Sequence, residues 1–147
     1  MIVSAFMTPR DKVVTCVATD NISMVLNKIL EMHVGSVVVM GDTDNAVGLV
    51  TKTDLLKAYQ ESLPIDTKVD SIMSKQLKTV SDRASRDIAA GMFEKNMIHH
   101  VVVVKDDGKF AGIISALDIA KELSLDSKAW PWNRSVSTSG RALPAQQ

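Results

Sequence analysis

A seven-residue segment occurs twice in this chain, and the duplication constrains the fold more than any other feature. Residues 48–54 read GLVTKTD and residues 112–118 read GIISALD, a shift of 64 positions. In each copy a glycine precedes two apolar residues, and a hydroxyl residue is followed three positions later by an aspartate. This pattern is typical of a strand that runs into a capped helix. Two copies in register predict two similar units.

The internal similarity extends over most of each half. Residues 29–57 align with residues 93–121 without a gap at the same shift. Residues 19–21 align best with residues 81–83, a shift of 62, which predicts two additional residues in or just after the first helix of the second half. Further upstream, Met7-Thr8 resembles Met73-Ser74. The chain is therefore interpreted as a tandem repeat.

Both halves show the same order of secondary-structure patterns. A short β segment precedes a helix, for which Asp20 and Asp82 are the expected N-caps. A β-branched strand, a turn and a second strand follow as a hairpin, and a final helix begins near the aspartate of the motif. The order β-α-β-β-α, present twice, predicts an α/β fold. The expected strands are residues 13–17, 34–40 and 46–50, then 77–80, 98–104 and 110–114.

One such unit, of roughly 55 residues, would bury too little surface to be stable alone. We therefore expect the two units to pack sheet to sheet. Trp130 and Trp132 precede a segment rich in Ser, Thr, Pro and Gly, for which we expect partial disorder. The two tryptophans would cover the end of the molecule or a dimer face, or would recruit a partner. The predicted parts are a first unit (1–62), a linker (63–68), a second unit (69–123) and a tail (124–147).

Composition excludes several classes of protein. The 17 basic and 17 acidic side chains cancel, so the chain lacks the positive field typical of nucleic-acid binders. No apolar run reaches 18 residues and the N-terminus lacks a signal pattern, so neither a membrane span nor secretion is expected. The one cysteine, Cys16, fits a reducing compartment such as the cytoplasm and reads as a core residue. Without a P-loop, an HExxH motif, a GxSxG motif or a cysteine pair, no enzyme is predicted.

Tandem β-α-β-β-α units that each end in Gly-h-h-Ser/Thr-x-x-Asp, where h is apolar, resemble a pair of CBS domains, the arrangement called a Bateman module. The resemblance covers about residues 5–123 and includes Met7-Thr8-Pro9, which is similar to the Met-Thr-Pro that often opens such domains. The valine-rich strands resemble the family's apolar-Pro-Val-Val segment, but both copies lack the proline. The resemblance implies two clefts between units related by a pseudo-twofold axis, and a module that forms a homodimer.

The resemblance also implies a function. CBS pairs are regulatory modules that bind adenosine-containing nucleotides, so we expect AMP or ADP first and ATP second, with Mg²⁺ accompanying ATP. Occupancy would be transmitted to a protein target or through the homodimer. The alternative is an interaction module whose clefts are vestigial or take another ligand such as S-adenosylmethionine. No metal site is expected, because the sequence offers too few ligands near its histidines.

The residues of the motif suit a nucleotide chemically. A helix N-terminus offers unpaired N–H groups to a phosphate, and Thr51 or Ser115 can add a hydroxyl hydrogen bond. The carboxylate of Asp54 or Asp118 can accept two hydrogen bonds from a ribose diol. Glycines in the motif would let the backbone approach the ligand. The same spacing also forms a capping box, so helix capping alone is the structural alternative.

His99 and His100 occupy the positions at which the first unit has Gly35 and Ser36. They resemble a His-Arg pair that reaches nucleotide phosphates in the γ subunit of AMP-activated kinase, which implies a phosphate contact in the second-unit cleft. With no arginine there, a monophosphate is favoured over a triphosphate, and affinity should fall as pH rises above the pKa of the imidazoles. Neighbours on a strand point in opposite directions, so at most one of the two is expected to face the cleft.

In the family each cleft borrows residues from the opening segment of the other unit, which completes the expected sites. The residues expected in the first-unit cleft are Thr51, Asp54, Gly35, Ser36, Gly48, Lys52, Lys78 and Thr79. The residues expected in the second-unit cleft are Ser115, Asp118, His99, His100, Gly112, Val14, Thr15 and Cys16.

Overall fold

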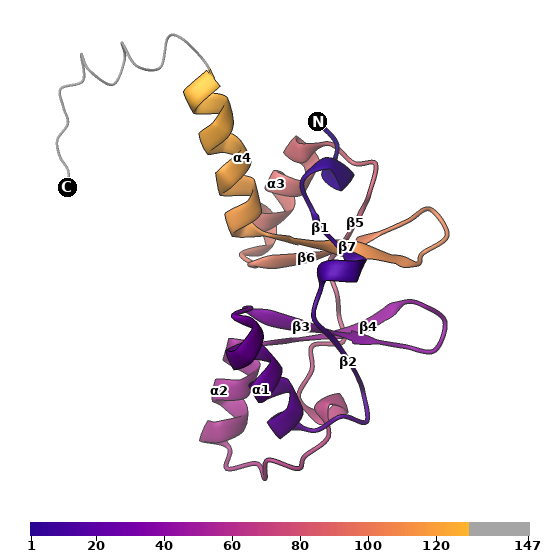
Figure 1. Ribbon diagram of the computed structural model, residues 1–147, viewed down its shortest axis with the longest axis vertical. Helices are drawn as coiled ribbons and strands as arrows, with labels where there is room; N and C mark the ends of the chain where they lie inside the picture. The colour runs from indigo at the N-terminus through magenta and orange to yellow at the C-terminus, as the bar shows by residue number, and fades with distance from the viewer. Residues whose placement is uncertain (130–147) are drawn as a thin grey trace, which may run out of the picture.

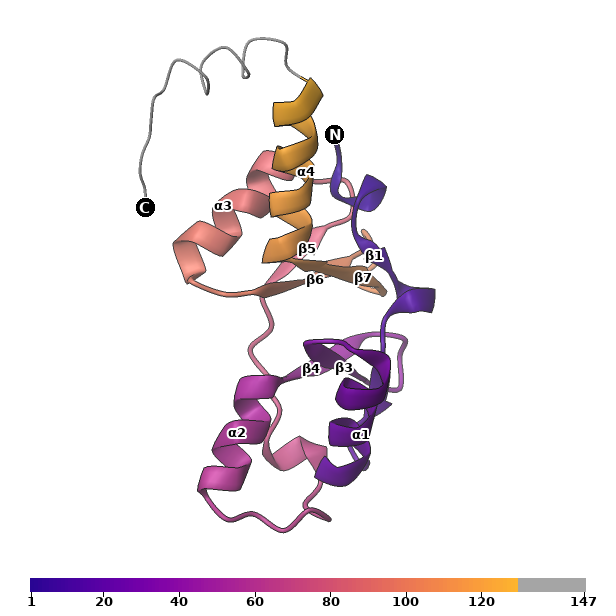
Figure 2. The same cartoon turned by 60° about the vertical axis from the view of Figure 1, so that its left-hand side comes forward.

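The two repeats form two α/β layers whose sheets face each other at the middle of the molecule, with the helices on the outer sides (Figures 1 and 2). This computed structural model describes residues 1–129, apart from the side chains of residues 127–129. The predictions for Trp130, Trp132 and the end of the tail lie outside the described residues. The first unit consists of β2 (Thr15–Val17), α1 (Ile22–Met32), β3 (Ser36–Met40), β4 (Ala46–Thr51) and α2 (Lys52–Gln60). The second consists of β5 (Thr79–Ser81), α3 (Arg86–Asn96), β6 (His100–Val104), β7 (Phe110–Ser115) and α4 (Ala116–Ala129).

The sheets confirm the predicted order of elements and the duplication. In the first unit β2 pairs parallel with β3, and β3 pairs antiparallel with β4. In the second unit β5, β6 and β7 repeat this arrangement, and β1 (Thr8–Pro9) adds a fourth strand beside β7. The registers are equivalent, since Thr15 pairs with Val38 and Thr79 with Val102. A shift of 64 therefore relates the two sheets residue by residue.

The first helices correct the predicted alignment. They begin at Ile22 and Arg86, also 64 positions apart, so the second half carries no additional residues there. The N-caps are Asn21, whose Oδ1 accepts from the backbone of Met24 at 2.9 Å, and Ser85. The expected caps Asp20 and Asp82 are wrong. The Asp20 carboxylate instead accepts from the backbone N–H of Val17, which closes the turn before the helix.

The additional residues lie in the first unit instead. Thr8 pairs with Ile113 of β7, and Ser74 pairs with Leu49 at the equivalent place on β4. Seven positions separate Thr8 from Thr15, whereas five separate Ser74 from Thr79. The longer connection contains a 3₁₀ turn, η2 (Arg10–Lys12), and this turn is a local difference between the two halves.

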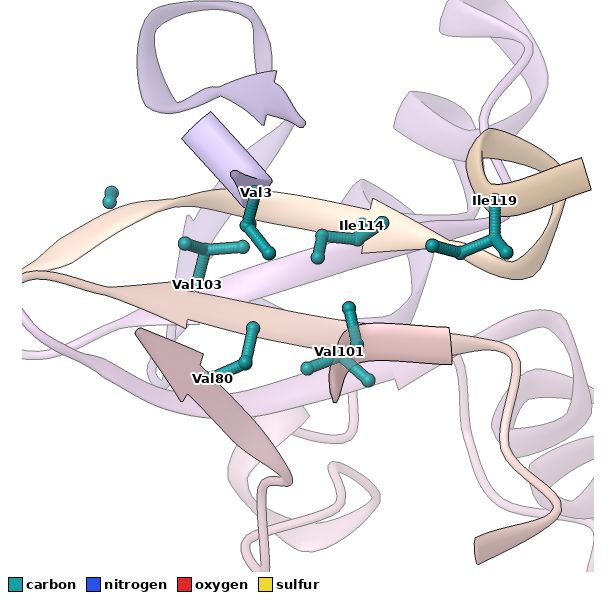
Figure 3. Packing of buried hydrophobic residues seen from close by; sticks show 8 residues of the cluster. Val3, Val80, Val101, Val103, Ile114 and Ile119 are labelled. Atoms are coloured by element: carbon teal, nitrogen blue, oxygen red, sulfur yellow. The ribbon is translucent and has the colours of Figure 1, made fainter. Parts of the chain in front are cut away.

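The opening segments of the two repeats are exchanged between the units. The N-terminal turn η1 (Val3–Ala5) lies on the second unit, where the N–H of Val3 donates to the carbonyl of Ala84 at 2.8 Å. Figure 3 shows Val3 packed with Val80, Val101, Val103, Ile114 and Ile119. The turn η3 (Val69–Ser71) in turn lies on the first unit, with Val69 buried in its core. The packing units therefore differ from the sequence repeats.

The buried valine runs explain why the sheets face each other. In β3, Val37 and Val39 pack under the helices of the first unit, while Val38 points to the opposite sheet. Val38 belongs to a central cluster with Leu49, Val102, Phe110 and Ile113, which come from both units. Each fully buried side chain of this kind contributes about 1.5–3 kcal/mol to folding. Strands buried on both faces account for the unbroken apolar runs.

The sheets have two distinct ends. At the helix end, β3 and β6 begin and β4 and β7 run into α2 and α4; at the hairpin end lie the turns 41–45 and 105–109. The last helix, α4, continues to Ala129, beyond the predicted start of the tail at residue 124. Within residues 1–129 no helix is long and apolar enough to cross a bilayer.

Candidate functional site

A pocket of about 620 Å³ opens between the two units at the helix end of the sheets. This volume lies in the range of sites that hold drug-sized ligands and cofactors. Its apolar wall comes from both units, with Leu49 of β4 opposite Val102 of β6. The polar part of the lining also mixes the two units. The lining residues are Gly35, Leu49, Thr51, Lys52, Thr53, Asp54, Lys57, Ser74, Gln76, Leu77, Lys78, Met97, Ile98, His99, His100 and Val102.

Thr51 and Asp54 line this pocket and also cap α2. The backbone N–H of Thr51 donates to Oδ2 of Asp54 at 2.8 Å, and the Thr51 hydroxyl donates to the same oxygen at 3.1 Å. The backbone N–H of Asp54 donates to Thr51 Oγ1 at 3.4 Å, which completes the capping box. Oδ1 of Asp54 accepts no hydrogen bond from the residues that the structure describes. One oxygen of the carboxylate therefore holds the helix start, and the other has no hydrogen-bond partner within residues 1–129.

Ser115 and Asp118 form the same cap on α4 but lie outside this pocket. The N–H of Ser115 donates to Asp118 Oδ2 at 2.8 Å, and the N–H of Asp118 donates to Ser115 Oγ at 3.1 Å. Ser115 follows Ile113 by two positions on β7, so it also points toward the opposite sheet. The 620 Å³ pocket nevertheless gathers the counterpart residues of the first unit and not these two.

His99 and His100 line the pocket with Asp54, and His100 is also the cross-strand partner of Ser115. His100 follows the alternation of β6 and points to the first unit, as Val102 does. Its ring lies beside Gly35, where an added Cβ would come within 3.7 Å of Nε2. His99 precedes the strand and does not follow its alternation, so both histidines line the pocket.

The electrostatics of His100 reflect its position. Burial lowers the pKa of His100, the neighbouring His99 lowers it further, and the Asp118 carboxylate raises it by a smaller amount. The imidazole is therefore neutral at neutral pH in the free protein. A phosphate placed beside it would favour the protonated form.

Gly48 and Gly112 serve the protein rather than a ligand, which corrects the expected reason for these glycines. The space where Gly48 lacks a Cβ is filled by the thioether of Met73, which belongs to the exchanged opening segment of the second repeat. The corresponding space at Gly112 is filled by the carbonyl of Thr8 in β1. Neither glycine lines the pocket. Both allow an opening segment to lie close against a strand of the other unit.

The other residues expected in the second-unit cleft do not line the 620 Å³ pocket. Cys16 is buried in the core of the first unit, and burial raises the pKa of its thiol to about 11. Val14 packs against the same core, and the Thr15 carbonyl accepts from Lys28 Nζ at 2.6 Å. Cys16 is therefore a packing residue, which corrects its assignment to the cleft. Of the residues expected in the first-unit cleft, Ser36 and Thr79 also lie outside the lining of the pocket.

The sequence reasoning missed several lining residues. Lys57 lies one helical turn after Asp54, so helical periodicity alone would have indicated it. Ser74 and Gln76 reach the pocket through the exchanged opening segment, which no spacing in the sequence reveals. Within residues 1–129 no group of three or more His, Cys, Asp or Glu side chains could hold a metal ion.

Comparison with curated proteins identifies relatives whose own roles are largely undescribed. An uncharacterized 17.7 kDa protein of Acidianus ambivalens is 32% identical over 93 residues, which span 63% of this chain and 56% of that protein. An L-aspartate semialdehyde sulfurtransferase of Methanosarcina acetivorans is 29% identical over 114 residues, or 78% of this chain and 22% of the enzyme. The match thus spans little more than half of the first of these relatives and about a fifth of the second.

Comparison with solved structures identifies the fold. The protein CBSX2 in complex with AMP has a TM-score of 0.74 at 26% identity, covering 86% of this chain and 98% of that one. The CBS domain protein PAE2072 of Pyrobaculum aerophilum, complexed with AMP, has a TM-score of 0.75 at 26% identity, covering 85% and 99%. The CBS domain pair of MJ0100, in complex with 5′-methylthioadenosine and S-adenosyl-L-methionine, has a TM-score of 0.77 at 19% identity and covers 86% and 98%, a likeness of fold alone.

The CBS domain family model matches residues 3–61 and again residues 69–125. These two matches cover most of the chain and coincide with the two β-α-β-β-α repeats. The duplicated motif, the facing sheets and the family match agree, and the chain belongs to the CBS domain family as a tandem pair.

Proposed function

We propose that this chain is a non-catalytic regulatory module that binds an adenine nucleotide, AMP or ADP, in the 620 Å³ pocket at the helix end. The observation that carries the proposal is that Thr51 and Asp54 line one pocket with apolar and cationic residues of the other unit. A ribose diol would donate to the free Oδ1 of Asp54, the base would lie between Leu49 and Val102, and phosphate would meet the cationic side chains. AMP in two relatives at 26% identity supports this choice of ligand.

Regulation follows from the origin of the lining. Because the pocket takes residues from both units, a bound nucleotide would favour the spacing of the units that suits it best. A ligand shifts such an equilibrium only by its difference in affinity between two shapes. Occupancy would in this way reach a surface that a protein target or a second copy recognises. ATP, with Mg²⁺, is the second ligand in order of preference.

We test nucleotide binding by isothermal titration of AMP, ADP and ATP into the full chain. We expect saturable binding of AMP that Asp54→Asn weakens at least tenfold, because the amide is a poorer acceptor and adds a donor where the ribose hydroxyls donate. Lys12→Ala, which changes an exposed residue outside the lining, is the matched control. No binding at millimolar nucleotide by a folded protein would refute the proposal. Chromatography of nucleotide incubated with the protein tests the absence of turnover.

A homodimer is part of the same proposal. The outer helices of the first unit expose large apolar side chains, with Leu30 63%, Leu56 69% and Tyr59 85% exposed. Apolar groups gathered on one helical layer favour association with a second copy. Light scattering of the full chain and of Leu56→Glu measures this, and an unchanged monomer mass for both would remove the dimer from the proposal.

A further inference from the structure

The pocket and its pseudo-symmetric counterpart carry different charges. A shift of 64 relates the lining residues from Leu77 onward to equivalents in the other half, whereas Ser74 corresponds to Thr8 and Gln76 lies opposite the longer connection. The equivalence extends to Lys78 and Val14, because Val102 N donates to the carbonyl of Lys78 at 3.0 Å and Val38 N donates to that of Val14 at 3.1 Å. Both halves keep the hydroxyl, the aspartate and the capped helix. What differs is the set of cations around them.

Most cations of the pocket are replaced by uncharged residues at the equivalent positions. Lys52 corresponds to Ala116, Lys78 to Val14 and His100 to Ser36, whereas Lys57 keeps a lysine, Lys121. Three exchanges run in the opposite direction, because Met97 corresponds to His33, Gly35 to His99, and Gln76 to the turn Arg10–Lys12 of the longer connection. His33 is exposed at the C-cap of α1. The pocket thus has three lysines around Asp54, whereas the equivalent positions around Asp118 hold Lys121 and, in the longer connection, the exposed Lys12. The two lysines that the pocket has at the helix start and the opening segment, Lys52 and Lys78, have no charged equivalent in the counterpart.

One cation of the longer connection, Arg10, is held away from the counterpart. Arg10 lies in the longer connection, but its guanidinium forms a bidentate pair with Asp44 and donates to the carbonyl of Phe110 at 3.4 Å. Its carbon also lies 5.9 Å above the ring of Phe110. Asp44 and Phe110 are at the hairpin end, and Ser115 is at the opposite end of β7. The Arg10 side chain is therefore held at the hairpin end, away from the Asp118 cap.

A cluster of lysines discriminates among adenosine compounds by charge. Cations around a pocket attract a phosphate dianion, add little to the binding of an uncharged nucleoside and oppose the binding of a sulfonium cation. The apolar wall and Asp54 would make the same contacts with every adenosine compound, because the base and the ribose are common to all of them. Selectivity between such ligands therefore rests on the cations.

Resting on the proposed function, we propose that the chain binds one phosphorylated adenosine ligand, at the Asp54 pocket, with Lys52, Lys57 and Lys78 as the residues that select phosphate-bearing compounds over uncharged or cationic ones. The counterpart at Asp118 keeps its cap as a structural feature and takes no phosphate. The duplicated motif has one binding role and one structural role.

The test is titration of the full chain with AMP, adenosine and S-adenosylmethionine, together with two kinds of variant. Lys78→Val and Lys52→Ala install the residues that the equivalent positions already hold, so the fold should tolerate them. Lys57→Ala and Lys121→Ala form a matched pair of exposed helical lysines one turn after the two aspartates. Circular dichroism checks that each variant is folded.

We expect one AMP per chain, with AMP at least tenfold tighter than adenosine or S-adenosylmethionine. The Lys78→Val variant should bind AMP about tenfold more weakly and adenosine less than twofold more weakly. Lys57→Ala should lower the affinity for AMP, whereas Lys121→Ala should leave it unchanged. Two AMP per chain, equal affinity for adenosine, or equal effects of Lys57→Ala and Lys121→Ala would overturn this inference and leave nucleotide binding standing. If none of the compounds binds, the proposed function falls and this inference falls with it.

Discussion

Replacing Gly112 by alanine should destabilise the protein much more than the same change at its repeat counterpart, Gly48. A Cβ at residue 112 would overlap the carbonyl of Thr8 and approach Pro9 Cα at 3.3 Å, and both are backbone atoms of β1. At residue 48 the overlap is with the side chain of Met73, whose Cγ would lie 2.9 Å away. A thioether side chain can move to another rotamer, whereas a paired strand can move only by giving up its register.

The magnitudes follow from these neighbours. Overpacking costs about 1–3 kcal/mol, and we assign about 3 kcal/mol to Gly112→Ala, because displaced β1 also loosens Val3, and about 1 kcal/mol to Gly48→Ala. With a urea m-value of about 2 kcal/mol/M, the unfolding midpoint should fall by about 1.5 M and 0.5 M respectively. The assay is urea unfolding followed by circular dichroism. Equal shifts for the two variants, or no shift at Gly112→Ala, would refute the exchanged opening segment as the reason for these glycines.

Three further predictions concern buried groups. Because the pKa of His100 is lowered in the folded protein, its contribution to the free energy of unfolding is complete above the ordinary value of 6.5 and is lost as the pH falls through the lowered pKa. Unfolding titrations from pH 7.5 to 5 should show this loss of stability, and the His100→Ser variant should lose less. Cys16 has a thiol pKa of about 11 and a buried side chain, so a thiol reagent at pH 8 should react with it only at urea concentrations that unfold the chain, and rapid labelling of the native protein would contradict this placement. Val38→Ala and Val102→Ala should each cost about 2 kcal/mol, and the double variant should cost less than their sum because the two side chains share the cluster between the sheets; strict additivity in chemical unfolding would argue against that contact.

The sequence predicted the repeat and the order of its elements because these depend on local patterns. The glycine, the apolar pair and the Ser/Thr-x-x-Asp spacing of the motif form strand ends and capping boxes at Thr51 and Ser115, as the pattern indicated. The N-caps were misplaced by one residue and by three, since Asp20 and Asp82 stand close to the true caps and have equal capping propensity. Composition alone does not choose between neighbouring candidates for a cap.

The site was predicted less completely because its lining depends on how the two sheets are oriented relative to each other. Thr51, Asp54, Lys52 and Lys78 were assigned to one pocket and do line it. The histidines were assigned to the second-unit cleft, and they also line the pocket of Asp54, because the packing turns their strand toward the first unit. Only the direction of β6 relative to β4 decides this, and that direction is a property of the packed sheets.

The contacts between the units are divided along the sheets in a way that bears on the proposed regulation. At the hairpin end, Arg10 ties Asp44 to Phe110, and the N–H of Phe110 donates to the carbonyl of Asp44 at 3.0 Å. The apolar cluster around Val38 fills the middle, and the pocket opens at the helix end. A ligand held by Asp54 and the lysines would therefore add contacts at the end opposite the tied turns. Because the hairpin end is already fixed, a change of spacing there would be small, and the starts of α2 and α4 would respond most to occupancy.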